Sequence, residues 1–398
     1  MAKVLLKKGE GRTLSAGGAW IYDNEIAKIE GDFENGDIVA VEAANGFHLG
    51  YGYLNTRSKI TVRMLTRDPD AVIDGAFWER RVREALEYRL HTTGLASCRL
   101  IFGEADQLPG LTADKFGDMI VTQTLSLGME RLKDTIFPIL LRQLPELGYP
   151  VRGIYERNDA KSRTLEGLER GQGFYGEAFD PHAIMEENGL LYEIDAENGQ
   201  KTGFFLDQRF NRMAIRPMAK GGRVLDCFCN AGGFGLNAAA AGAAHVTCVD
   251  ASQLAVDTAR ANAERNGLAD RMDFVCADIF ELLPELEAQG QRYDLVILDP
   301  PAFAKSRAAV KSAARGYREI NRRGMALVRH GGFLATCTCS HFMTPELFRS
   351  TVAQAARDAH CRLVQVEERT QGPDHPMLWG ADESSYLKFL LFQVRHER

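Results

Sequence analysis

The chain has 398 residues, of which 45% are hydrophobic, and a formal net charge of −6. This length exceeds that of one ordinary domain, so we expect three domains, each with its own core. No apolar run approaches the length of a membrane span, and the N-terminus lacks the apolar core of a secretory signal. A soluble, cytoplasmic protein is therefore predicted. The acidic balance excludes a wholly basic nucleic-acid coat but leaves room for a local basic patch.

Eight cysteines without a regular spacing indicate thiols in a reducing compartment rather than a disulfide framework. Two C-x-C pairs, Cys227 with Cys229 and Cys337 with Cys339, raise the alternative of zinc. Structural zinc sites usually have the wider C-x₂₋₄-C spacing, so no metal site is expected.

The first domain, residues 1–72, has short alternating segments such as 37–42 and 60–65, separated by glycine-rich turns. This pattern is typical of a small β-barrel or sandwich. Its basic residues are predicted to be exposed, with Trp20 and Tyr22 nearby: Lys7, Lys8, Arg12, Lys59 and Arg63. They form either a solvated face or a grip on an RNA backbone, for which Lys7, Lys8 and Arg12 are the candidates.

The second domain, residues 73–187, is predicted to be a small α/β unit. Helices are expected at 77–90 and 131–144, and the arginines of the first are predicted to form a solvated face. Strands are expected at 99–111, 119–125 and 153–157, the first two flanking a Pro-Gly turn. No spacing there is typical of a metal or nucleophile site.

The third domain, residues 188–398, alternates strands and helices in a regular way. Helices such as 252–266 separate strands predicted at 223–228, 245–250, 273–278, 293–299 and 333–339. Such alternation predicts a Rossmann-like, doubly wound parallel sheet. Two final runs, 362–367 and 386–394, are expected to form an antiparallel edge pair. The fold class is therefore α/β, with a β-barrel and a small α/β domain before the main sheet.

Residues 224–235 combine a strand, a glycine-rich turn and a helix start, which lets backbone approach a nucleotide-like ligand. Asp226 is placed to receive a methionine ammonium, Asp250 two ribose hydroxyls and Asp278 an adenine amino group. We therefore expect S-adenosylmethionine. The predicted donor site comprises Gln208, Asp226, Phe228, Asn230, Gly232, Gly233, Asp250, Ala251, Ser252, Asp278, Ile279 and Asp299.

The same stretch also fits the dinucleotide pattern G-x-G-x-x-A through Gly233, Gly235 and Ala238. A pyrophosphate favours a helix start without acids around it, whereas Asp226 lies just before this turn. A nicotinamide or flavin is thus the weaker alternative.

Two neighbouring strands end in reactive residues: one in Asp299, the other in Cys339. A thiol beside a carboxylate can attack a flat, electron-poor ring and hydrogen-bond its polar edge. The simpler alternative for Cys339 is a buried structural thiol. Cys337 lies one residue pair deeper on the same face and is predicted to belong to the core.

Between Asp299 and Cys339, residues 305–323 hold seven basic residues and one acidic residue. Such a run forms either a solvated helix face or a set of phosphate contacts beside the catalytic mouth. The candidates for RNA contacts are Lys305, Lys311, Arg315, Arg318 and Arg322.

Four strings, at residues 199–209, 315–321, 338–340 and 374–376, make the whole chain resemble the PUA-domain-containing 5-methylcytosine methyltransferases of bacterial 23S ribosomal RNA. The resemblance implies an attacking Cys339 and a cytosine-contacting Asp299. It also implies S-adenosylmethionine as donor and ribosomal RNA, naked or partly assembled, as partner; a homodimer is compatible with it. Unlike many RNA cytosine-5 methyltransferases, this chain has no cysteine directly after Asp299-Pro-Pro.

Two other functions remain open at this point. The same fold can methylate purines or amino groups of RNA, which needs no thiol. A non-catalytic RNA-binding assembly factor is the second, although an intact set of site residues argues against it.

Overall fold

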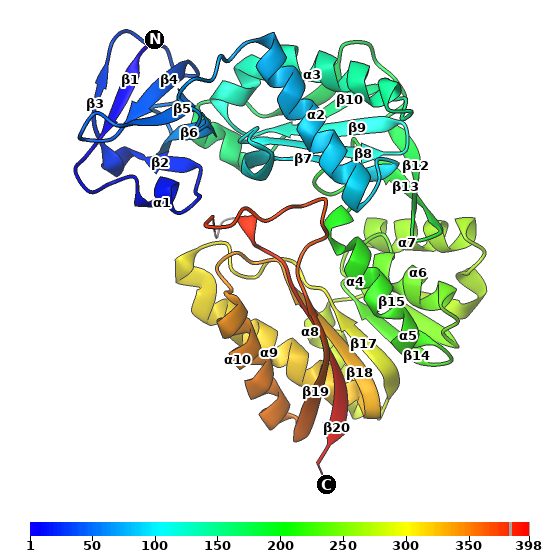
Figure 1. Ribbon diagram of the computed structural model, residues 1–398. Helices are drawn as coiled ribbons and strands as arrows, with labels where there is room; N and C mark the ends of the chain where they lie inside the picture. Colours follow the sequence, from blue (N-terminus) through cyan, green and yellow to red (C-terminus); the bar gives the residue numbers. More distant parts are fainter. Residues whose placement is uncertain (382–383, 398) are drawn as a thin grey trace. The chain divides into compact units, whose positions relative to one another are not determined.

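The computed structural model describes residues 1–381 and 384–397 and forms two compact units (Figure 1). The first unit contains Met1–Met185, Ile194–Leu206 and Pro373–Ser384. The second contains Glu186–Glu193, Asp207–Gly372 and Ser385–Arg398. Strands β12 (His182–Glu187) and β13 (Leu190–Asp195) pair with each other, and the chain passes between the units within them. The division into domains 1–72, 73–187 and 188–398 stays a prediction.

The N-terminal part of the first unit is one six-stranded sheet with the strand order β2-β6-β5-β4-β1-β3. The short strands predicted there are confirmed, and a single turn of helix, α1 (Arg12–Ser15), interrupts them. Their bounds are β1 (Lys3–Leu6), β2 (Trp20–Tyr22), β3 (Ile26–Glu30), β4 (Ile38–Glu42), β5 (His48–Leu54) and β6 (Ile60–Thr66). Alternate residues such as Val39 and Val41 fill its core.

One prediction about this sheet is wrong: the side chain of Arg63 is only 12% exposed. Its guanidinium pairs with Glu104 at 3.0 Å and Glu166 at 3.2 Å, and it lies over the ring of Trp20. Alternation along a strand shows which residues share a face, but not which face another part of the fold covers.

The remainder of the first unit is a five-stranded sheet, in the order β11-β10-β9-β8-β7, with two long helices. The helices are α2 (Gly75–Thr92) and α3 (Leu127–Glu146). The strands are β7 (Ser97–Phe102), β8 (Leu111–Phe116), β9 (Met119–Thr124), β10 (Gly153–Asn158) and β11 (Gly171–Tyr175). The single strand predicted at 99–111 is wrong, because a 3₁₀ turn at Gly103–Asp106 ends β7 before β8 begins.

The solvated face predicted for the arginines of α2 is also wrong at one position. Arg89 is fully buried, and its guanidinium bonds both carboxylate oxygens of Asp106. An ion pair of this geometry compensates the burial of both charges, which residue spacing alone does not reveal.

The second unit is built on a seven-stranded sheet with the order β16-β15-β14-β17-β18-β20-β19. Five strands are parallel: β14 (Arg223–Cys227), β15 (His245–Asp250), β16 (Met272–Cys276), β17 (Tyr293–Leu298) and β18 (Val328–Thr338). The predicted antiparallel edge pair is confirmed as β19 (Cys361–Arg369) and β20 (Lys388–His396). The predicted doubly wound sheet, parallel except for its antiparallel edge pair, is therefore present.

Helices cover both faces of this sheet (Figure 1). One group comprises α4 (Arg209–Ala214), α5 (Arg216–Ala219), α6 (Gly233–Ala240) and α7 (Gln253–Arg265). The other comprises α8 (Ile279–Ala288), α9 (Val310–Leu327) and α10 (Pro345–Asp358). Within the described residues, no helix is both long and apolar enough to cross a membrane.

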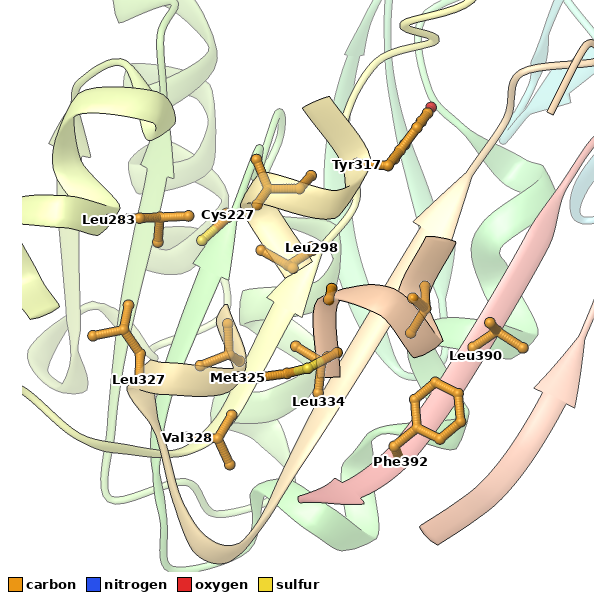
Figure 2. Packing of buried hydrophobic residues seen from close by; sticks show 14 of the residues in the cluster. Cys227, Leu283, Leu298, Tyr317, Met325, Leu327, Val328, Leu334, Leu390 and Phe392 are labelled. Carbon is orange, nitrogen blue, oxygen red and sulfur yellow. The ribbon is translucent and has the colours of Figure 1, made fainter. Parts of the chain in front are cut away.

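The core between the sheet and the second group of helices fixes the strand ends. Figure 2 shows Leu298, Leu334 and Leu390, from three adjacent strands, in one buried cluster with Met325 of α9. Each fully buried Leu contributes ~1.5–3 kcal/mol relative to an exposed one. The sheet is thus a rigid support for residues that follow its strands.

Candidate active site

The turn after β14 has an unusual backbone. Phe228, Asn230 and Gly232 all have positive φ angles, at 65°, 49° and 81°. A Cβ on Gly235 would lie 2.3 Å from Sγ of Cys248, so only glycine allows the start of α6 to approach the sheet this closely. Backbone groups of the turn therefore line the edge of the sheet, as predicted for a nucleotide-like ligand.

Asp226, in β14, is 1% exposed. Its Oδ2 accepts a hydrogen bond from N–H of Gly235 at 2.7 Å, while its Oδ1 has no partner among the described residues. Arg212, whose charge acts on Asp226, makes its bidentate pair with Glu187 instead. Burial raises the pKa of Asp226 to about 8. A buried carboxyl with an unused oxygen is suited to receive a cationic ligand group.

Asp250 ends β15 and holds two loops together. One carboxylate oxygen accepts N–H of Asn230 at 3.0 Å, and the other accepts N–H of Ser252 at 2.9 Å. Ala251 lies between Asp250 and Ser252, and the hydroxyl of Ser252 caps α7. These bonds fix the carboxylate at the edge where ribose hydroxyls are expected.

Asp278 follows β16 and caps α8: its side chain accepts N–H of Phe280 at 2.8 Å. Ile279, the first residue of α8, is buried. Gly233 begins α6. Every predicted donor residue so far described lies near the carboxyl end of β14, β15 or β16, either in the strand itself or in the turn and helix start that follow it.

Asp299 directly follows β17 and is half-buried. Its Oδ1 accepts a hydrogen bond from Nε2 of Gln208 at 2.9 Å, and Asn211 donates to Oε1 of Gln208 at 2.7 Å. Burial, and then the negative charge of Asp207, raises the pKa of Asp299 to about 7. At neutral pH this group is therefore present in both protonation states.

Cys337 is fully buried, as predicted, but it is not a simple core residue. Burial, and then the negative charge of Asp299, raises the pKa of its thiol well above the usual range. A thiol that resists ionisation is a poor nucleophile. Cys337 thus shapes the surroundings of the carboxyl group.

Cys339 follows β18, and its side chain is half-buried. Both of its sequence neighbours are held firmly. Thr338 donates from its hydroxyl to Oη of Tyr317 at 2.8 Å, and Oγ of Ser340 accepts N–H of Ala304 at 3.1 Å. Because Tyr317 lies in α9 and Ala304 in the loop after Asp299, the first bond ties the cysteine segment to α9 and the second ties it to the loop that begins with the acid.

The sequence analysis missed Lys388, the first residue of β20, which pairs with Thr338 across the sheet. It is 7% exposed, and its Nζ donates to the carbonyl oxygens of Ser340 and Tyr386, both at 3.1 Å. A sequence feature could have identified it, since Lys388 is the one charged residue within the apolar run 387–392.

The candidate cations of the basic run, residues 305–323, fall into an unpaired N-terminal half and a paired C-terminal half. Lys305, Lys311 and Arg315 are exposed and have no ion pair with the residues that the structure describes. Arg318 pairs with Asp358, and Arg322 with Glu319. In the first unit, Lys7, Lys8 and Arg12 are exposed, as expected.

All eight cysteines lie in the described part of the chain, and none forms a disulfide. In the same part, no group of three or more His, Cys, Asp or Glu side chains is arranged to hold a metal ion.

Two family models match the chain: S-adenosylmethionine-dependent methyltransferase over residues 170–393 and a PUA-like domain over residues 4–67. Proteins named ribosomal RNA large subunit methyltransferase I, from Shewanella denitrificans and Pseudoalteromonas translucida, are 42% and 40% identical to it. Each alignment covers 98% of this chain and 99% of the relative.

Solved structures share the whole fold. A putative S-adenosylmethionine-dependent methyltransferase from Streptococcus mutans is 21% identical, covers 99% of this chain and 100% of its own, and has a TM-score of 0.82. A putative methyltransferase complexed with SAH, also 21% identical with the same coverage, has a TM-score of 0.83. The family models and the full-length relatives agree: the chain is an S-adenosylmethionine-dependent methyltransferase and belongs to the family of the ribosomal RNA large subunit methyltransferase I proteins.

Proposed function

We propose that this enzyme methylates carbon 5 of a cytidine in 23S ribosomal RNA through a covalent bond to Cys339. The observation that carries the proposal is a half-buried thiol directly after β18, which pairs with β17, the strand that Asp299 follows. Large-subunit ribosomal RNA is the substrate class in the names of the relatives. The resemblance described above adds the 23S molecule and the cytosine ring.

The residues at the turns fit S-adenosylmethionine. The unused Oδ1 of Asp226 suits an ammonium, and the carboxylate of Asp250 suits ribose hydroxyls. When bound, this cofactor supplies an electrophilic methyl group. Asp278 and the backbone of the turn after β14 are the remaining candidates for holding it.

Carbon 5 of cytosine is a poor nucleophile, so a thiolate must first add to carbon 6. The S–C6 bond makes carbon 5 enamine-like and able to take the methyl group. A base then removes the carbon 5 proton, the S–C6 bond breaks and the thiolate leaves. Asp299 can hold a proton near neutral pH, so it can donate to the ring nitrogen, with Gln208 fixing its other oxygen.

For the RNA, the exposed cations of both units are the proposed phosphate contacts. They are Lys7, Lys8 and Arg12 in the first unit and Lys305, Lys311 and Arg315 in the second. Arg318 and Arg322, which the sequence also suggested, already neutralise acidic neighbours. Because their charges are already paired, these two arginines are weaker candidates for phosphate contacts.

RNA containing 5-fluorocytidine tests the covalent mechanism. Fluorine cannot leave carbon 5 as the proton does, so elimination stops and enzyme and RNA remain joined. We expect an adduct that maps by mass spectrometry to Cys339 and is absent in Cys339→Ser, because a hydroxyl is hardly ionised at neutral pH. Cys361→Ser, a change of a buried cysteine in β19, should form the adduct normally.

The other outcomes separate the alternatives. An adduct at a different cysteine would overturn the role of Cys339. Methylation of a purine or an amino group without any adduct would indicate the related RNA methyltransferase activity.

A further inference from the structure

Lys388 is a buried cation whose position is fixed from two sides. Its Nζ donates to the carbonyl oxygens of Ser340 and Tyr386, each at 3.1 Å. Ser340 is the residue that follows Cys339, so the ammonium group lies beside the segment that carries the proposed nucleophile. Tyr386 is itself anchored, because its hydroxyl donates to Asp207 at 2.6 Å.

The charge of Lys388 has no carboxylate within ion-pair distance among the described residues. The groups that act on it electrostatically are Cys339, which follows β18, and Glu346, in the first turn of α10. Glu346 is exposed, so water screens its charge. Burial lowers the pKa of Lys388 to about 8. Carbonyl oxygens solvate an ammonium but do not neutralise it, which leaves Cys339 as the neighbour that can.

We propose that the ammonium of Lys388 is the counter-ion that keeps Cys339 as a thiolate. This makes Lys388 a positioning residue, and the inference rests on the proposed function in taking Cys339 as the nucleophile. The thiol proton leaves to solvent. When the S–C6 bond forms, the sulfur lone pair enters the ring; when that bond breaks, the pair returns to sulfur beside the ammonium, which keeps its proton throughout.

The competing role is purely structural: the two hydrogen bonds of Lys388 link the ends of β18 and β20. Lys388→Gln separates the two roles, since the amide can donate to the same carbonyl groups but carries no charge. Lys388→Arg keeps the charge. Lys220→Met, an exposed lysine of the same unit, is the control.

The measurement is the rate of alkylation of Cys339 by iodoacetamide as a function of pH, followed by peptide mass spectrometry on the full chain without RNA or donor. We expect Lys388→Gln to raise the midpoint of this profile by about one pH unit, which is about a ten-fold slower reaction at pH 7. Lys388→Arg and Lys220→Met should both keep the wild-type midpoint. Cys276, an exposed thiol in the same chain, provides an internal reference that should not change.

An unchanged alkylation profile in Lys388→Gln would overturn the proposal, and a lowered melting temperature with that unchanged profile would assign the structural role. If Lys388→Gln does not fold, Lys388→Arg still tests the idea, since it must keep the wild-type midpoint. Because no RNA is present, this result is independent of the 5-fluorocytidine experiment. If the alkylation profile shifts but no RNA adduct forms, the proposed function is wrong, while the pairing of Lys388 with the Cys339 thiolate still holds.

Discussion

The buried charges at the strand ends of the second unit differ from the buried ion pairs of the first unit, although the second unit also contains one such pair, Arg212 with Glu187. In the first unit, Arg89 pairs with Asp106, and Arg99 makes a bidentate pair with Asp114. In the second unit, Asp226 and Asp299 are held by an N–H group and an amide rather than by a cation, and their pKa values rise to about 8 and 7. A compensated charge holds a structure together, whereas an uncompensated one at a strand end is available to a ligand.

The first unit uses its paired charges to anchor distant segments. Arg89 also donates to the carbonyl oxygen of Asp374 at 2.9 Å, and the Asp374 carboxylate accepts N–H of Arg99 at 3.0 Å. Thr202 donates to Oδ2 of Asp114 at 2.6 Å. The segments Ile194–Leu206 and Pro373–Ser384 are thereby attached to the sheet of the small α/β part.

The largest expected effect is therefore on stability and lies in the first unit. Arg89→Met leaves the buried carboxylate of Asp106 without its cation, and such a change typically lowers the free energy of unfolding by ~3–5 kcal/mol. Urea unfolding measures it. Arg131→Met, which removes an exposed pair with Asp37, should lower it by less than about 1 kcal/mol. Equal losses in the two variants would show that burial of the pair is unimportant.

Next in size is an effect on catalysis alone. Asp299→Asn keeps the shape of the side chain but removes its acid, so we expect kcat to fall by about 10²–10³. Because the folded pKa of Asp299 lies above 3.8, the melting temperature should not fall. Asp273→Asn, at an exposed acid on β16, should leave kcat unchanged. If Asp299→Asn instead unfolds the protein, Asp299 belongs with the structural charges and the contrast between the units fails.

Asp226→Asn should weaken donor binding and stabilise the protein without donor. Lost hydrogen bonds to a charged ligand group typically weaken binding by ~1.5–3 kcal/mol, which calorimetry can detect. Because the folded pKa of Asp226 lies above the unfolded value of 3.8, its favourable contribution is present at low pH and is lost as pH rises toward about 8. The advantage of Asn in melting temperature should thus grow from pH 5 to pH 8. A constant difference would mean that Asp226 is ionised throughout.

The sequence was sufficient to predict where the strands end, but not which side chains form ion pairs with each other. The alternation of strands and helices placed Asp226, Asp250 and Asp299 at one edge of a parallel sheet, because that edge follows from connectivity alone. Burial of Arg63 and of Arg89 depends on carboxylates supplied by distant parts of the chain. Charge type and spacing do not contain that information, so both were expected at the surface.

Segment 373–384 shows the same limit at the level of the fold. It lies between two strands of the second unit in sequence, yet its contacts assign it to the first. A short motif such as Asp374-His375-Pro376 indicates that a loop is specialised, but not which unit it joins. Two hydrogen bonds to Asp374 decide that, one from the guanidinium of Arg89 and one from the backbone N–H of Arg99, and they are visible only in the structure.

The smallest expected effect concerns the two halves of the basic run. A triple variant of Lys305, Lys311 and Arg315 to Ala removes exposed cations that have no ion pair with described residues. The matched triple variant of Arg318, Arg322 and Arg323 removes cations that already pair with Asp358, Glu319 and Glu287. Both variants lose the same formal charge, so any difference between them reports local pairing.

If phosphate contacts lie in the unpaired half, the first variant should reduce the slope of log affinity against log salt by about 0.7 for each lost contact with single-stranded RNA. Fluorescence anisotropy across a salt series measures this slope. The second variant should change the slope less, because its arginines release few counter-ions while they remain paired with carboxylates. Equal slopes in the two variants would mean that net charge alone governs RNA binding at this surface, and that the pairing seen along α9 does not select the contacts.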